Sequence, residues 1–285
     1  MTEHLRRSFL YTPADDLEMM EKAVGLDTAD AVIFDLEDAI PDDAVADARE
    51  NIESVLQGRS FGRTEACVRI NGLQTPHWES DLRAAVAADI DTVILPMVEE
   101  PAQLDRATQV AEAANGAIPE LIVTIETPKG LFAVDEIAAH GGSLPHVTGL
   151  SYGFGDYTRA IGATGKPTRI HDFLSELIVS AAAVGGLDPI ATVYQDFTDT
   201  TGLREQAKEC RAIGYIGQKA IHPSQLEIIN EMYTPTPAEV EEATHFVDTF
   251  DTADRDSLVV DGVFLDTAIV DQYRTVLSRH EEVAE

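Results

Sequence analysis

The stretch LIVTIETPKG, residues 121–130, carries the pattern that decides the fold. It opens with an unbroken apolar run rich in β-branched residues and turns polar at Glu126. A strand that lacks alternating polar residues is buried on both faces, as happens in parallel sheets covered by helices. We therefore predict that 121–126 is a buried parallel strand whose carboxyl end presents Glu126.

Outward from this stretch, short apolar runs alternate with longer amphipathic segments. The predicted strands are SFLY (8–11), AVIFDLE (31–37), ACVRIN (66–71), DTVILPM (91–97), LIVTIE (121–126), VTGLSYG (147–153), PIATV (189–193) and YIGQKAIH (215–222). The predicted helices include DDLEMMEKAV (15–24), HWESDLRAAVAA (77–88), PAQLDRATQVAEAA (101–114) and DFLSELIVSAAAV (172–184). In the last helix we expect Asp172 as the cap and Phe173 on the apolar face. Eight alternations over about 225 residues favour a (β/α)8 TIM barrel. An open doubly wound sheet is the alternative, because the pattern does not prove closure.

The pattern changes after residue 233. The segment TPTPAEVEEATHFVDTFDTAD (234–254) predicts a capped helix, followed by a hairpin around Asp261-Gly262 and a final helix. We therefore divide the chain into a barrel domain, residues 1–233, and a C-terminal extension, residues 234–285. The extension is expected to pack on the barrel or on a neighbouring subunit.

The charge of the chain excludes several classes of partner. It contains 51 Asp and Glu residues against 20 Lys and Arg, a formal net charge of −31. Such a chain lacks the basic surface that binds nucleic acid or an anionic membrane, so we expect neither partner. A hydrophobic content of 44% argues against disorder. We expect adaptation to a salt-rich cytoplasm, where the screening length falls to about 3 Å; an ordinary acidic protein is the alternative.

The N-terminal region and the cysteines favour a cytoplasmic protein. The residues MTEHLRRSFLYTP contain no apolar run of signal-peptide length, and no segment approaches the length of a membrane span. Cys67 and Cys210 lie in apolar contexts without metal-ligand spacing. We expect both to be buried thiols in a reducing compartment.

Polar residues follow several of the predicted strands directly. These groups are Asp35-Leu36-Glu37-Asp38, Arg69-Ile70-Asn71-Gly72, Pro96-Met97-Val98-Glu99, Glu126-Thr127-Pro128 and Gly153-Phe154-Gly155-Asp156. The carboxyl ends of the strands of a parallel barrel meet at one face, where barrel enzymes place their active sites. The sequence therefore predicts a clustered site at this face.

Glu126 and Asp156 are the candidate metal ligands. They follow adjacent strands and have no Cys or His close by in sequence, which suits Mg²⁺, with Mn²⁺ also possible. The alternative is that Glu126 pairs with an arginine and Asp156 only shapes its turn. Glu37 and Asp38 are either further ligands through water or partners that fix Arg69.

Three arginines are candidates for binding an anionic substrate. The planar fork of Arg69 can bind a carboxylate bidentately, although a structural ion pair with the acidic residues nearby is equally compatible with its position. Arg6 and Arg7 either form salt bridges or anchor an anionic substrate group. No dinucleotide fingerprint or phosphate-binding loop is present, and Ser151 and His222 lack the context of a hydrolase nucleophile. We expect no NAD, flavin or PLP.

An ordered set of motifs resembles the citrate lyase β-subunit-like family within the HpcH/HpaI aldolase superfamily, which includes malyl-CoA, β-methylmalyl-CoA and citramalyl-CoA lyases. The matching segments are RRSFLYTPADD (6–16), FDLEDAIP (34–41), VRING (68–72), LPMVEE (95–100), LIVTIETPKG (121–130), GLSYGFGDY (149–157), KAIHPSQ (219–225) and DGVFLDTAIV (261–270). They occur in family order and cover nearly the whole chain. The family commonly has a lysine after the proline of LPMVEE, where this chain has Met97.

The resemblance implies roles for particular residues. It matches Glu126 and Asp156 to the Mg²⁺ ligands, and Arg69 to the arginine that binds the substrate carboxylate or oxyanion. Glu37 and Asp38 match acidic residues of the same site, and we expect both to be catalytic. It matches Asp266 to a catalytic acid/base that a neighbouring subunit supplies, in a homotrimer or hexamer. We also expect Arg6, Arg7, Asn71 and Pro128 to contact the substrate or CoA.

The activity that the resemblance implies is retro-Claisen cleavage of an acyl-CoA substrate. Malyl-CoA or β-methylmalyl-CoA would give glyoxylate plus acetyl-CoA or propionyl-CoA, with Mg²⁺ as Lewis acid and Arg69 stabilising the enolate. The alternatives are a malyl-CoA thioesterase that uses the same site and a citramalyl- or citryl-thioester lyase. A non-catalytic subunit of a citrate lyase-type complex is a further possibility.

Overall fold

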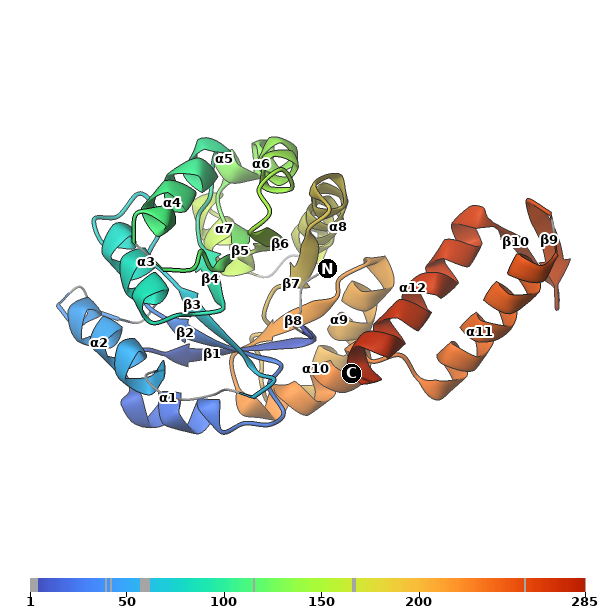
Figure 1. The fold of residues 1–285 in the computed structure, drawn as a ribbon, viewed down its shortest axis with the longest axis horizontal. Coiled ribbons are helices and arrows are strands. Elements are labelled where there is room, and N and C mark those ends of the chain that lie inside the picture. Colours follow the sequence, from blue (N-terminus) through green and yellow to red (C-terminus); the bar gives the residue numbers. More distant parts are fainter. Residues whose placement is uncertain are drawn as a thin grey trace. The chain divides into compact units, whose positions relative to one another are not determined.

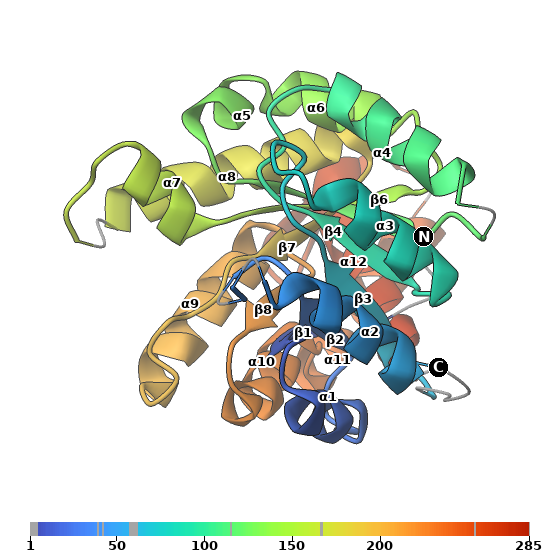
Figure 2. The same cartoon turned by 90° about the vertical axis from the view of Figure 1, so that its left-hand side faces the viewer.

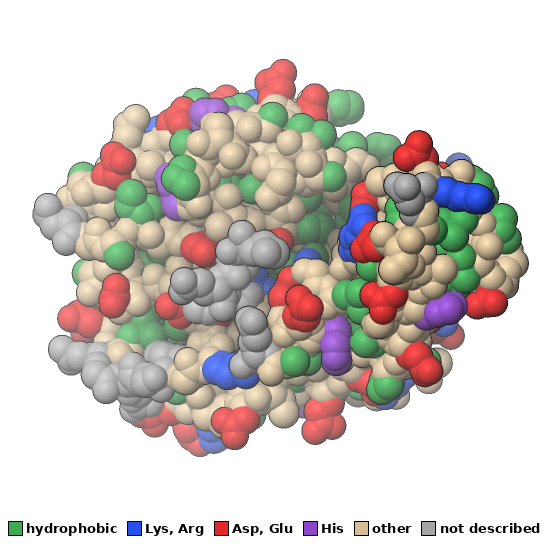
Figure 3. Space-filling model, turned by 45° about the vertical axis from the view of Figure 1, so that its right-hand side comes forward, with side chains coloured by type: hydrophobic (Ala, Val, Ile, Leu, Met, Phe, Trp, Pro, Cys, Tyr) green, Lys and Arg blue, Asp and Glu red, His purple; other side chains and the backbone are tan. Residues whose placement is uncertain are grey.

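The computed structural model describes residues 5–38, 40–41, 43–56, 62–114, 116–165, 168–253 and 255–284. The chain divides into two compact units, Met1–Asn230 and Glu231–Glu285. No helix within these described ranges is long and apolar enough to cross a membrane. Acidic side chains are spread over the face of the molecule in Figure 3, with few basic ones between them.

The first unit is a closed barrel of eight parallel strands surrounded by helices (Figures 1 and 2). The strands are β1 (Ser8–Pro13), β2 (Ala31–Asp35), β3 (Glu65–Arg69), β4 (Thr92–Leu95), β5 (Glu120–Ile125), β6 (Val147–Tyr152), β7 (Asp188–Ala191) and β8 (Gly217–Ala220). The barrel closes because β1 pairs with β8 as well as with β2. The predicted TIM barrel is therefore confirmed, and the open sheet is excluded.

The helices of this unit follow the strands in alternation, as the sequence predicts. They are α1 (Leu17–Val24), α2 (Val45–Leu56), α3 (Trp78–Ala87), α4 (Ala102–Glu112), α5 (Pro128–Phe132), α6 (Val134–Gly141), α7 (Phe154–Ala160), α8 (Thr168–Gly185), α9 (Thr200–Ile213), the 3-10 turn η1 (Pro223–Gln225) and α10 (Leu226–Tyr233). The boundary between the two units falls within α10.

The α8 helix differs from its prediction at its start. It begins at Thr168, so Asp172 lies inside the helix and does not cap it. Phe173 is 56% exposed, because the buried face runs through Leu174 and Ile178 and leaves Phe173 to one side. Asp172 precedes the apolar run in the sequence, as a cap would, but the helix extends four residues further toward the N-terminus.

The interior of the barrel has three levels from the amino to the carboxyl ends of the strands. Alternate side chains of a strand point inward, and on β3 these are Glu65, Cys67 and Arg69. The middle level is apolar and consists of Phe9, Ala31, Ile33, Cys67, Ile94, Ile122 and Ile190. Below it, at the base, Glu65 lies in a polar cluster, and above it, at the mouth, Arg69 lies in another. The apolar level separates these two polar ends.

The second unit is a helical pair that carries a β-hairpin. It contains α11 (Pro237–Thr252), β9 (Ser257–Val260), β10 (Val263–Asp266) and α12 (Thr267–Ala284). Thr236 caps α11 in a capping box with Glu239. Asp261 and Gly262 form the turn with φ angles of 49° and 85°, as a two-residue hairpin of this twist requires. The capped helix, the hairpin and the final helix are therefore all confirmed.

Candidate active site

Arg69, the last residue of β3, is the centre of the polar cluster at the barrel mouth. Its Nε and Nη2 atoms donate to Asp35 at 2.7 and 2.5 Å, and Nη2 also donates to Asp38 at 2.7 Å. Its Nη1 lies 3.1 Å from an oxygen of Glu37, and the guanidinium stacks 4.7 Å from the centre of the Tyr11 ring. Burial lowers the pKa of Arg69, but the surrounding anionic groups outweigh it and raise the pKa above its usual range.

Glu37 and Asp38 therefore contact Arg69, one of the two roles that the sequence left open. Asp35, which the prediction did not assign, makes the bidentate contact with the guanidinium. Burial raises the pKa of Glu37 above its ordinary value, and the positive charge of Arg69 offsets only part of this effect. The cluster thus combines a fixed cation with a carboxyl that gains a proton more readily than an exposed one.

Glu126 follows β5 at the mouth and is buried, with 3% of its surface exposed. Its Oε2 accepts a hydrogen bond of 2.9 Å from the backbone N–H of Met97. Met97 has a φ of 50°, a conformation that side-chain-bearing residues seldom adopt, so strained backbone directs this N–H at the carboxylate. Burial raises the pKa of Glu126, while Lys219 and Arg69 oppose the rise.

Gly153 allows the β6–α7 turn to approach Glu126. A Cβ atom at this position would overlap the Glu126 carboxylate, so only glycine fits without a shift. Asp156 lies just beyond, in the first turn of α7, and forms an ion pair of 2.5 Å with Arg159. Asp156 is near enough to Glu126 for its negative charge to raise the pKa of Glu126. The structure thus brings the two candidate metal ligands into one region.

The donor set fits a loosely held Mg²⁺. The described residues contain no group of three or more His, Cys, Asp or Glu side chains arranged to hold a metal. Glu126 and Asp156 offer two carboxylates, and Mg²⁺ is commonly bound by one or two carboxylates with water and substrate oxygens completing its shell. These two residues are therefore those that would hold the ion.

Lys219 is a site residue that the sequence prediction did not assign. It is 3% exposed, lies on β8 and donates a long hydrogen bond of 3.4 Å to the hydroxyl of Thr124. Burial lowers the pKa of Lys219 to about 8, although Glu126 acts in the opposite direction. The sequence signal that could have identified Lys219 was a lysine within the run YIGQKAIH, in a chain poor in lysine.

Arg6 and Arg7 lie at the other end of the barrel, away from the charged groups of the mouth. The Arg6 guanidinium is buried at the base, where it donates to Glu65 at 2.9 and 2.6 Å and to Glu120 at 2.5 Å. It also donates to Thr148 at 3.1 Å. Arg7 is paired with Asp30 at 2.8 Å. Both arginines therefore form salt bridges, the alternative reading of their sequence positions.

Asn71 and Pro128 have structural roles near the mouth. The backbone and side-chain N–H groups of Asn71 donate to Asp81 at 2.9 and 2.8 Å, and its amide also donates to the carbonyl of Leu36 at 3.0 Å. Pro128 is the first residue of α5, which Thr127 caps. Neither side chain joins the cluster of charged groups around Arg69.

Asp266 ends β10 in the second unit. Its Oδ1 accepts a hydrogen bond of 2.9 Å from the backbone N–H of Ile269 and so caps α12. Supply of this carboxylate to the barrel of a neighbouring subunit stays a prediction.

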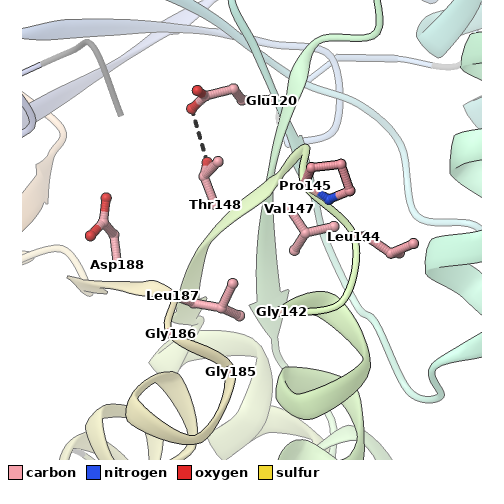
Figure 4. A pocket seen from close by; sticks show the side chains of 10 residues that line it. All are labelled: Glu120, Gly142, Leu144, Pro145, Val147, Thr148, Gly185, Gly186, Leu187 and Asp188. Carbon is pink, nitrogen blue, oxygen red and sulfur yellow. Dashed lines mark hydrogen bonds between the residues drawn. The ribbon is translucent and has the colours of Figure 1, made fainter. Parts of the chain in front are cut away.

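A pocket of about 270 Å³ opens at the base of the barrel (Figure 4). Its lining consists of Glu120, Gly142, Leu144, Pro145, Val147, Thr148, Gly185, Gly186, Leu187 and Asp188. Glu120 and Thr148 are hydrogen-bonded to each other and to Arg6. None of the charged groups of the mouth lines this pocket, so it is separate from the candidate active site.

A closed parallel barrel with carboxylates and buried cations at the carboxyl ends of its strands has the arrangement of TIM-barrel enzymes. The model of the HpcH/HpaI aldolase/citrate lyase family matches residues 7–223, and the chain belongs to this family. The resemblance drawn from the motifs is thereby confirmed.

Named relatives and solved structures match almost the whole chain. A (3S)-malyl-CoA thioesterase of Cereibacter sphaeroides strain KD131 is 35% identical over 99% of this chain and 96% of its own length. An L-malyl-CoA/β-methylmalyl-CoA lyase of the same strain is 31% identical over 98% and 95%. The crystal structure of CitE from Mycobacterium tuberculosis, in complex with magnesium, acetoacetate and coenzyme A, superposes with a TM-score of 0.82. It is 26% identical and covers 98% of this chain and 100% of that one.

Proposed function

We propose that this protein is a Mg²⁺-dependent enzyme that acts on a malyl-CoA-type thioester at the barrel mouth. The observation that carries the proposal is the position of Glu126, buried beside Arg69 and Lys219 and in electrostatic contact with Asp156. Carboxylates for a divalent ion next to buried cations suit a small anionic substrate. The names of the two relatives and the ligands of the solved CitE structure support the same choice.

The residues of the mouth have distinct tasks in this proposal. Mg²⁺ held by Glu126 and Asp156 would supply Lewis-acid chemistry to the hydroxyl and carboxylate oxygens of the malyl group. Arg69, fixed by three carboxylates, supplies positive potential where charge develops on the thioester oxygen. Glu37, whose pKa is raised by burial, is a carboxyl that can hold a proton at the mouth and donate it.

Hydrolysis of the thioester is the net reaction that we propose first. Water attacks the thioester carbonyl carbon, the carbon–sulfur bond breaks, and the sulfur leaves with a proton as the thiol of CoA, so that malyl-CoA yields malate and CoA. The thioesterase relative favours this reaction because its identity and its coverage of both chains are higher than those of the lyase.

Carbon–carbon cleavage is the second candidate and the one that the motifs favoured. After a base removes the hydroxyl proton, that oxygen forms the carbonyl of glyoxylate, and the bond between the hydroxyl-bearing carbon and the thioester α-carbon breaks. The electron pair of this bond leaves as the enolate of acetyl-CoA, which takes up a proton at carbon. Asp266 is the proposed donor of that proton, supplied by a neighbouring subunit. The lyase relative, which also matches almost the full length, favours this reaction.

Product analysis separates the two reactions. Purified protein is incubated with malyl-CoA and Mg²⁺ in high salt, and the products are separated by chromatography. Malate with free CoA supports hydrolysis, and glyoxylate with acetyl-CoA supports cleavage. Absence of all four products, with the protein folded, would contradict the proposed substrate.

A further inference from the structure

Lys219 has donors that none of the described residues accepts. Its side chain leaves β8 and crosses the barrel interior to Thr124 on β5, immediately above the apolar level. An ammonium can donate three hydrogen bonds. Within the described ranges, Lys219 makes only the 3.4 Å hydrogen bond to Thr124 and no ion pair. Burying a charge without a close partner is costly, which points to a ligand that completes its contacts.

Arg69 is in the opposite situation. All three of its nitrogens already face carboxylates, those of Asp35, Glu37 and Asp38. A substrate carboxylate that approached Arg69 would compete with these groups and would be repelled by them. Of the two buried cations that the described residues place at the mouth, Arg69 and Lys219, only Lys219 therefore has free donors.

We propose that the Lys219 ammonium binds the carboxylate of the 2-hydroxy or 2-oxo acid part of the substrate, and that Arg69 and its three carboxylates form a fixed wall beside it. The inference rests on the proposed function, because it assumes a substrate with a carboxylate at the barrel mouth. It assigns the contact with the substrate carboxylate to Lys219 on β8. The sequence had predicted this contact for Arg69 on β3.

The alternative is that Lys219 only balances the buried negative charge of Glu126, with which it interacts electrostatically. In that case removal of the ammonium would change the affinity for a substrate anion only indirectly, by changing the affinity of the site for the metal. Metal binding and anion binding would then weaken together. The proposed role predicts that anion binding weakens alone, because the ammonium contacts the anion and repels the metal.

The test measures oxalate binding by calorimetry on the full-length protein saturated with Mn²⁺. Oxalate, like a 2-oxo acid, carries a carboxylate beside a second oxygen. Lys219→Met should weaken oxalate binding roughly ten- to a hundredfold, the loss expected for a charge-assisted hydrogen bond. Binding of Mn²⁺ should stay equal or become tighter. Lys219→Arg should recover part of the oxalate affinity.

Lys129→Met is the matched control, because this lysine is exposed and pairs only loosely with Glu99 and Glu100 at 3.4 Å. It removes the same charge and should leave oxalate binding within about twofold. Unchanged oxalate affinity in a folded Lys219→Met variant overturns the inference, as does a parallel loss of Mn²⁺ and oxalate binding.

A structure of the unmodified protein with Mn²⁺ and oxalate tests the same contact without a variant. Lys219 Nζ within hydrogen-bond distance of an oxalate oxygen supports the inference, and an oxalate bound at the mouth without this contact overturns it. Failure of the proposed function is recognised separately, because protein that does not turn over malyl-CoA can still bind oxalate through Lys219.

Discussion

Glu126 is the residue whose chemistry the proposed activity needs most. We expect Glu126→Gln to lose Mn²⁺ affinity and to lower turnover of malyl-CoA by at least about a hundredfold, because an amide is a weaker ligand than a carboxylate. The melting temperature should change little or rise, since the variant removes a buried charge. Calorimetry with Mn²⁺ and product analysis measure both effects. Glu100→Gln, an exposed control, should retain activity; wild-type activity in Glu126→Gln would remove Glu126 from the metal site.

Gly153 offers a test of the close approach that shapes the site. Gly153→Ala places a methyl group against the Glu126 carboxylate and should cost about 1–3 kcal/mol of stability with a large loss of activity. Gly155→Ala is the matched control, because a Cβ atom there meets only the Gln195 amide, at 3.8 Å. Thermal unfolding and turnover of the two variants are compared. Equal stability and equal turnover of the two variants would show that the β6–α7 turn can shift to accommodate the methyl group.

The positions of Arg6 and Arg69 show how far single residues can be placed from sequence. Arg69 lies in the carboxyl-terminal half of its predicted strand, residues 66–71, and Arg6 precedes its own, so in a parallel barrel they belong at opposite ends. The chain direction of the predicted strands was therefore enough to place Arg6 at the base and Arg69 at the mouth. The contact of Lys219 with Thr124 could not be predicted from the sequence. It joins β8 to β5 across the barrel interior, which exists only when the barrel is closed.

At the scale of elements, the strands were the most predictable part of the chain. Each predicted apolar run overlaps an observed strand, since burial on both faces leaves little freedom of composition. The start of α8 was misplaced, because Asp172 resembles a cap but lies on an early turn of a longer helix. The turn at Asp261-Gly262 was predictable because few other residue pairs adopt its backbone angles.

The ion-pair cluster at the base of the barrel joins several strands through Arg6. We therefore expect it to contribute to the free energy of unfolding. Arg6 bonds to the first residues of β3 and β5 and to Thr148 on β6. Arg6→Met should destabilise the barrel by about 3–5 kcal/mol, because the fully buried Glu65 loses its partner. Chemical denaturation measures this change. Lys22→Met, which breaks an exposed pair with Glu18, should cost less than about 1 kcal/mol, and equal losses would contradict the assigned role.

At the scale of the whole molecule, the net charge of −31 makes stability depend on salt. Repulsion among acidic side chains opposes the compact state in dilute buffer and is screened in molar salt, where the Debye length is about 3 Å. Screening also weakens exposed ion pairs, but each contributes at most about 1 kcal/mol. We therefore expect the melting temperature to rise by at least about 5 °C between 0.1 and 2 M KCl.

Calorimetric scans across a KCl series measure this dependence. Sucrose solutions of matched osmolality serve as the control, because they favour the compact state without screening charge. A melting temperature that stays constant or falls in KCl would contradict the proposal that the acidic surface is an adaptation to salt.

The base of the barrel also has a consequence for how the chain is made. Arg6 precedes Thr148 by 142 residues, so at usual synthesis rates it waits roughly 7 to 30 seconds for that partner. During this time no shorter nascent chain can form the complete base cluster. We expect chains stalled before residue 148 to be digested readily by protease, and chains stalled after β8 to resist it. Synthesis through β8 then determines when the barrel becomes resistant to protease.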